Sequence, residues 1–129
     1  MATNPAFIGT PRLSVASLSA ANTALDGTGT ITSLITGAST GTRVLEINMQ
    51  CSATSAAALV NIFLSTDSGS TWTLFDQITV TAATVSNTVR ANRNLATYTN
   101  LILPDATYRL GVTTTIAQAT RVYALGGDF

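Results

Sequence analysis

The stretch that decides the fold is Arg43–Ser52, with the sequence RVLEINMQCS. Every second residue of this stretch is apolar, namely Leu45, Ile47, Met49 and Cys51. Successive side chains of a strand point to opposite faces of its sheet, so a period of two predicts a half-buried strand. The residues expected on the opposite, outer face are Val44, Glu46, Asn48 and Gln50.

The rest of the chain repeats this pattern in short segments that end at clusters of Gly, Asn, Asp and Ser, which form turns. No segment shows a sustained helical period. Asp76 interrupts the apolar face of one segment, which indicates a bulge or a strand end. Further strands are expected over Arg12–Leu18, Thr30–Thr36, Ala58–Thr66, Trp72–Thr81, Val85–Ala91, Leu95–Leu103, Thr107–Thr114 and Thr120–Leu125.

Many short strands with regularly spaced turns are typical of a β-sandwich or barrel. The chain has 129 residues, which fits one domain. We therefore predict an all-β, single-domain β-sandwich. A jelly roll is the first choice and an immunoglobulin-like sandwich the second, since only the strand order separates them.

The predicted sandwich domain spans residues 12–125. Residues 1–11 contain Pro5 and Pro11 and are expected to form an extended N-terminal arm, because proline donates no backbone hydrogen bond. Residues 126–129, Gly-Gly-Asp-Phe, are expected to form a C-terminal tail.

The composition of the chain argues against some classes of partner and favours others. Only 9% of residues are charged, the net charge is zero and all six basic residues are arginines. A general nucleic-acid-binding protein needs a basic surface to displace counterions, so no nucleic acid is expected as a partner. The sequence has no run of about 18 apolar residues, so no membrane-spanning helix is expected either. A neutral surface with few charges favours association with other protein chains.

Residue types that carry catalysis are scarce. The chain has no histidine, so neither Cys51 nor any serine has a histidine base to activate it. Cys51 is the one cysteine, and we expect it to be a small buried side chain. The spacing pairs no carboxylates and matches no metal site. We therefore predict no enzyme activity, no catalytic or metal-binding residues and no cofactor.

Ser65-Thr66-Asp67-Ser68-Gly69-Ser70-Thr71-Trp72 resembles the Asp-box, whose pattern is Ser-x-Asp-x-Gly-x-Thr-Trp. In proteins that carry it, the Asp-box is a folded β-hairpin turn. Asp67 can accept hydrogen bonds from the turn, Gly69 can adopt a positive φ, and Trp72 can cover the hairpin. The residues to which we assign this structural role are Ser65, Asp67, Gly69, Thr71 and Trp72.

Three other segments form a familiar layout, namely Asn4–Arg12, Asp26–Thr30 and Val122–Phe129. The layout resembles small Thr- and Ala-rich β-proteins encoded among the head genes of tailed bacteriophages. The resemblance implies a virion structural protein, made in the host cytoplasm, that decorates or cements the capsid surface at symmetric positions. The implied partners are the major capsid protein or another virion protein, and further copies of the chain, with a trimer as one option.

The candidate partner contacts lie at the two ends of the chain: Asn4, Pro5, Phe7, Ile8 and Phe129. An extended arm can bind a neighbouring chain by adding a strand or by filling a groove. The alternative function is a glycan- or receptor-binding module of a phage tail or baseplate, with aromatic rings as its stacking platform. The rings available to it belong to Trp72, Tyr98, Tyr108 and Tyr123.

Overall fold

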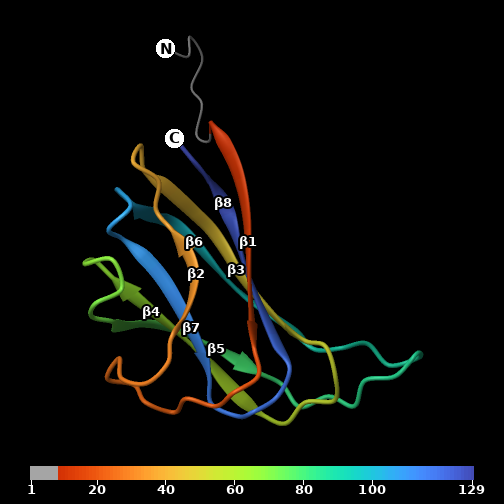
Figure 1. The fold of residues 1–129 in the computed structure, drawn as a ribbon. Coiled ribbons are helices and arrows are strands. Elements are labelled where there is room, and N and C mark those ends of the chain that lie inside the picture. The colour runs from red at the N-terminus through yellow and green to blue at the C-terminus, as the bar shows by residue number, and fades with distance from the viewer. Residues whose placement is uncertain (1–8) are drawn as a thin grey trace.

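Eight strands carry the regular structure of residues 9–129, the part of the chain that the computed structural model describes (Figure 1). Their bounds are β1 (Thr10–Leu18), β2 (Thr32–Thr36), β3 (Thr42–Cys51), β4 (Ala58–Ser65), β5 (Thr73–Val80), β6 (Arg93–Leu103), β7 (Arg109–Thr114) and β8 (Thr120–Asp128). These residues contain no helix. The all-β prediction is confirmed, and most strands lie close to the expected segments.

The strands form two antiparallel sheets that pack against each other as a β-sandwich (Figure 1). Sheet A has the order β1-β8-β3-β6, and sheet B has the order β2-β7-β4-β5. A hairpin joins β4 to β5, and every other connection crosses from one sheet to the other. An immunoglobulin-like sandwich pairs its first two strands in one sheet. Because β1 and β2 lie in different sheets, this chain does not have that arrangement.

The core lies between the sheets and is built from inward side chains of both. Sheet A contributes Ile47 of β3 and Val122 of β8, and sheet B contributes Ile62 of β4 and Val112 of β7, all fully buried. Burial of one such aliphatic side chain stabilises the fold by roughly 1.5–3 kcal/mol. Cys51, 1% exposed, belongs to the same cluster, which confirms its predicted role as a small buried side chain.

A β-bulge shifts the alternation of β3 at Leu45. Val44 pairs with Gly126 of β8 and Glu46 pairs with the next residue, Leu125, so Leu45 is the extra residue of the bulge. As a result Val44 is fully buried and Leu45 is 38% exposed. A shift of one residue reverses the facing of a strand segment, so the predicted facing of these two residues is wrong.

A second bulge lies in β5, where Asp76 predicted an irregularity. Ile62 pairs with Asp76 and Phe63 pairs with Leu74, so the register skips one residue of β5. The Asp76 carboxylate accepts a hydrogen bond from the Tyr98 hydroxyl at 2.8 Å. This hydrogen bond joins β5 of sheet B to β6 of sheet A.

The segment 85–91, expected as a strand, is part of a loop. Residues 81–92, here called the finger, join β5 to β6 and extend away from both sheets (Figure 1). At its tip, the Ser86 hydroxyl accepts hydrogen bonds from the backbone N–H groups of Thr88 and Val89. The strand prediction is wrong here because β-branched residues favour a strand mainly through packing against neighbouring strands.

Both expected end segments overlap with strands. Thr10 and Pro11, assigned to the arm, begin β1. Residues 126–128, assigned to a tail, complete β8 between β1 and β3. A Cβ on Gly126 would lie 2.0 Å from the backbone oxygen of Arg43. The tail prediction is wrong because this glycine allows β8 to approach β3 closely and continue the sheet.

The structure describes only one of the residues predicted to contact a partner at the chain ends. Asn4, Pro5, Phe7 and Ile8 lie outside the described residues. Phe129 is 46% exposed, and its backbone N–H donates to the Gly41 oxygen at 3.0 Å. The Gly9 N–H donates to the Asp128 oxygen at 2.7 Å, so Gly9 lies beside the end of β8.

Candidate functional site

The outer face of sheet A exposes apolar side chains. One row across its four strands consists of Val15, Tyr123, Asn48 and Leu95. In the next row Leu13 lies beside Leu125. Leu13 is 65% exposed and Val15 is 52% exposed, because they alternate with the buried Ala16 and Leu18. This group of exposed apolar side chains is therefore a candidate contact site.

A hollow of about 300 Å³ lies in this face. Its lining consists of Leu13, Asn48, Met49, Gln50, Arg90, Arg93, Tyr123 and Leu125. Arg90 belongs to the finger and Arg93 begins β6, so the finger contributes to one side of the hollow. Arg93 donates from Nε and Nη2 to Asn48 Oδ1, at 3.3 and 3.2 Å, which holds its guanidinium across the sheet.

The same face is rich in arginine. Arg43, Arg93 and Arg121 lie on sheet A at positions that alternate with inward residues, and Arg90 joins them from the finger. Glu46 is the acidic residue on these strands that faces the same way. We call the outer face of sheet A, together with Arg90, the basic face. It offers apolar contacts and cationic hydrogen-bond donors, which suit the binding of a partner.

Carboxylates gather in three turns beside sheet B, carried by Asp26, Asp67 and Asp105. Asp26 Oδ1 accepts a hydrogen bond from the Thr28 N–H at 3.1 Å, and Asp105 Oδ1 accepts one from the Thr107 N–H at 2.8 Å. The hydroxyls of the two threonines donate to the same oxygens. These bonds, the hydroxyl bonds most, lower the pKa of both carboxyls by stabilising the ionised form. We call the surface formed by the three turns the turn face.

The three turns contact one another. Ser68 in the β4–β5 turn donates from its N–H to the Thr107 oxygen in the β6–β7 turn, at 2.9 Å. A Cβ on Gly27 would lie 2.2 Å from the Trp72 oxygen, so the third turn packs on the end of the hairpin. The Trp72 ring covers Gly111, on the outer side of sheet B. The turn face and the basic face therefore belong to opposite sheets.

The Asp-box residues form the β4–β5 turn, and the predicted geometry is confirmed. Thr71 donates to Asp67 from its N–H at 2.9 Å and from its hydroxyl at 2.6 Å, and Ser65 Oγ donates at 2.8 Å. These three bonds lower the Asp67 pKa to about 2; the Thr71 hydroxyl bond has the largest effect, followed by the Thr71 N–H bond and the Ser65 bond. Gly69 has a φ of 90°, and its N–H donates to Ser65 Oγ at 2.8 Å. The Trp72 ring lies 3.5 Å from the position of a Cβ on Gly69, so it covers the turn.

The four aromatic candidates for a glycan platform do not come together. Trp72 covers the hairpin, and Tyr108 packs against the core. Tyr98 bonds to Asp76, and its pKa is raised by burial and by this bond. Tyr123 alone among the four lines the hollow of the basic face.

Other features of residues 9–129 do not form a chemical site. No group of three or more His, Cys, Asp or Glu side chains in this range could hold a metal ion. A helix able to cross a membrane is not found there. A cavity of about 590 Å³ lies along residues 17–32 and β7, and its lining is uncharged.

Comparison of the chain with protein-family models, with curated proteins and with solved structures finds no match. Its function is therefore inferred from the basic face, the turn face and the fold that separates them.

Proposed function

We propose that this protein is a structural component of a tailed-bacteriophage particle, and that it decorates or cements the capsid by binding other chains of the particle. The basic face is the observation that carries this proposal. Exposed apolar side chains such as Leu13 and Val15 lie there beside a hollow rimmed by polar groups. Patches of this kind are typical of protein–protein interfaces. The resemblance to phage head proteins supplies the biological setting.

The strand order supports the same proposal. We infer that the sandwich is a jelly roll, because its strands run β1-β8-β3-β6 in one sheet and β2-β7-β4-β5 in the other. A jelly roll consists of eight strands wound as two Greek keys, and viral capsid domains are among the proteins built this way. A shared architecture supports a function by analogy, so the basic face has the greater weight.

The test is to locate the chain on phage particles. An antibody against the purified chain should label intact tailed particles released by the bacterial strain that encodes it, and the label should lie on the capsid. The chain should also be present in many copies when purified particles are analysed by mass spectrometry. Its absence from purified particles would exclude the proposal.

A glycan- or receptor-binding module of a tail or baseplate is the second candidate. Tyr123 favours it, because its ring shares the hollow with the amides of Asn48 and Gln50 and the guanidinium of Arg93. Binding on a glycan array that Tyr123→Ala abolishes, together with antibody label on the tail, would favour this module. Capsid label without glycan binding would favour the decoration protein.

A further inference from the structure

We propose that the basic face binds the turn face of a second copy of this chain, so that copies assemble head to tail. This inference shares one premise with the proposed function, namely that the basic face is a protein interface. It adds that the protein bound there is a second copy of the chain. Its basis is a separation of charge within a chain whose net charge is zero.

The arginines and the acids lie on different sides of the sandwich. The basic face carries Arg43, Arg90, Arg93 and Arg121, with Glu46 as its acid. The turn face carries Asp26, Asp67 and Asp105, and Arg109 lies beside Gly69 in its hairpin. The remaining charged residues are engaged elsewhere, Arg12 with Asp128 and Asp76 with Tyr98. Each face therefore has an excess of one sign, and the signs are opposite.

Apolar side chains on the two faces also match. Leu25, directly before Asp26 in the turn face, is 53% exposed. The hollow of the basic face has apolar walls at Leu13 and Leu125. Insertion of Leu25 into this hollow would bring the Asp26 carboxylate towards the arginines that line it. An apolar side chain in a pocket with charged groups around it is the usual anatomy of a protein interface.

Charge also decides between the two ways in which copies can meet. Contact between two basic faces would place arginines against arginines, which is unfavourable, whereas contact with a turn face places opposite charges together. Contact between unlike faces leaves one free face at each end of the assembly. Further copies can therefore add until a ring closes or a filament forms.

The test uses the full chain and two variants, each with one face altered. Arg93→Gln with Arg121→Gln removes charge from the basic face. Asp26→Asn with Asp105→Asn removes charge from the turn face and keeps the side-chain oxygen that the turn threonines need. Each change should weaken self-association about tenfold, because exposed ion pairs contribute modestly. At a concentration where the parent associates in sedimentation velocity, each variant alone should be monomeric.

The decisive measurement is an equimolar mixture of the two variants. The arginine variant retains an intact turn face, and the aspartate variant retains an intact basic face. The mixture should therefore form a one-to-one dimer, and added salt should dissociate it. A mixture that remains monomeric, or a parent chain that is monomeric at every concentration, would overturn the proposal. Circular dichroism establishes that both variants are folded.

One variant of the basic face should have the opposite effect on self-association and serves as a control. Glu46→Gln removes its acid and should tighten self-association, so a weaker association would contradict the charge argument. Particle labelling distinguishes this inference from the proposed function. If the chain is found on capsids but does not self-associate, only the head-to-tail contact is contradicted. If the chain self-associates but is absent from particles, only its assignment to the virion is contradicted.

Discussion

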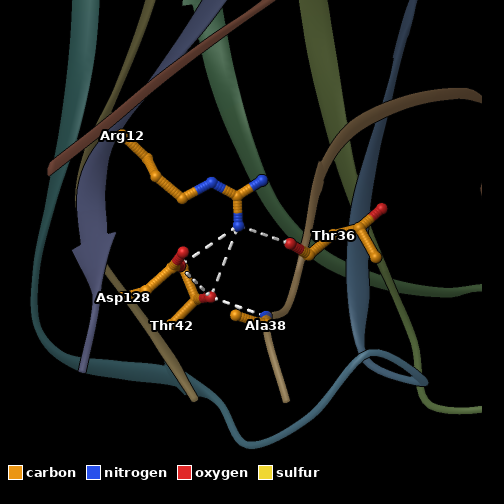
Figure 2. A network of polar contacts seen from close by, with 5 residues as sticks. All are labelled: Arg12, Thr36, Ala38, Thr42 and Asp128. Carbon is orange, nitrogen blue, oxygen red and sulfur yellow. Dashed lines mark hydrogen bonds and ion pairs between the residues drawn. The ribbon is translucent and has the colours of Figure 1, made fainter. Parts of the chain in front are cut away.

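Arg12 Nη1 lies 3.2 Å from Asp128 Oδ1, and this ion pair joins the first strand of the fold to the last (Figure 2). The same nitrogen donates to the Thr36 backbone oxygen at 2.7 Å, and the Thr42 hydroxyl donates to Asp128 Oδ1 at 2.7 Å. Thr42 Oγ1 also accepts a hydrogen bond from the Ala38 N–H at 2.8 Å. The network thus ties β1, β3 and β8 of sheet A to the end of β2 in sheet B.

Asp128→Ala should lower the free energy of unfolding by about 2 kcal/mol, because two donors lose a charged acceptor. Asp128→Asn keeps an oxygen for the Thr42 hydroxyl and should cost about 1 kcal/mol. The ion pair itself contributes little, since the side chains of Arg12 and Asp128 are 28% and 20% exposed. Urea unfolding at neutral pH measures both values. Equal losses in the two variants would show that the charge, and not the hydrogen bonds, matters here.

Acid should remove the stabilisation that Asp67 gives to the β4–β5 turn. Its pKa in the folded chain is lowered from 3.8 to about 2. A folded-state pKa below the unfolded value means that ionisation favours folding above pH 3.8, and that this contribution is lost as the pH falls towards about 2.

The matched variant for this prediction is Asp67→Asn, which cannot ionise. The parent should have the higher Tm at neutral pH, and the difference in Tm should shrink on acidification and vanish near pH 2. The lowered pKa values of Asp26 and Asp105 act in both proteins, so they do not enter the difference. A Tm difference that is independent of pH would contradict the assignment.

Gly126→Ala should be strongly destabilising although the change adds one methyl group. Its Cβ would lie 2.0 Å from the Arg43 oxygen, and a backbone atom cannot move aside without separating β8 from β3. We expect a loss of about 3 kcal/mol in urea unfolding. Gly9→Ala is the control, because its Cβ would meet no atom closer than 3.4 Å. Equal stability of the two variants would mean that Gly126 is not under this constraint.

The strands could be predicted because their side chains alternate, but the bulges could not all be found in this way. In β3 the apolar residues Val44 and Leu45 are adjacent, and either could face the core. The choice depends on the bulge against β8, where Val44 pairs with Gly126 and Glu46 with Leu125, residues that are distant in the sequence. At β5 the bulge had a local signal, the polar Asp76 on an apolar face, and the prediction was correct.

The basic face could not be predicted because it is assembled from strands that are distant in sequence. Arg90 and Arg93 are close in the chain, but Arg43 and Arg121 join them only through the order of sheet A. Leu13 and Val15 lie on the same side of β1, but their outward facing depends on which side of β1 packs on sheet B. The Asp-box turn, in contrast, is defined by contacts within eight residues, and the roles of Asp67, Gly69 and Trp72 could be predicted, whereas the positive φ of Ser68 could not.

Asn92 should control the stability of the finger. Its Oδ1 accepts a hydrogen bond from the Cys51 N–H at 3.0 Å, and its Nδ2 donates to Ser55 Oγ at 3.1 Å and the Thr81 oxygen at 2.6 Å. Asn92→Ala leaves the Cys51 N–H without this acceptor and should cost about 2 kcal/mol. Local opening should also speed tryptic cleavage after the exposed Arg90.

Asn87→Ala, in the exposed part of the finger, is the control for Asn92→Ala. A surface substitution of this kind should change the free energy of unfolding by less than about 0.5 kcal/mol. If both variants are cleaved after Arg90 at the rate of the parent, Asn92 does not anchor the finger.

Deletion of residues 2–8 should leave the sandwich intact and weaken its binding to phage particles. Gly9 and Thr10 must be kept, because the Gly9 N–H bonds to the Asp128 oxygen and Thr10 pairs with Asp128 in the β1–β8 ladder. Fixing the backbone of an arm costs about 1–2 kcal/mol per residue, and contacts with a partner chain would offset that cost.

Residues 2–8 could contribute to folding or to binding, and two measurements separate these roles. Thermal melting and particle binding are compared between the deletion, Phe7→Ala and Ile8→Ala. An unchanged Tm with weaker binding is the expected result, and the two alanine variants should reproduce part of the loss if apolar contacts are responsible. A deletion that unfolds the chain would place the arm in the core. Unchanged binding would leave the basic face as the site of attachment, and Arg93→Gln with Arg121→Gln should then weaken binding to particles as well as self-association.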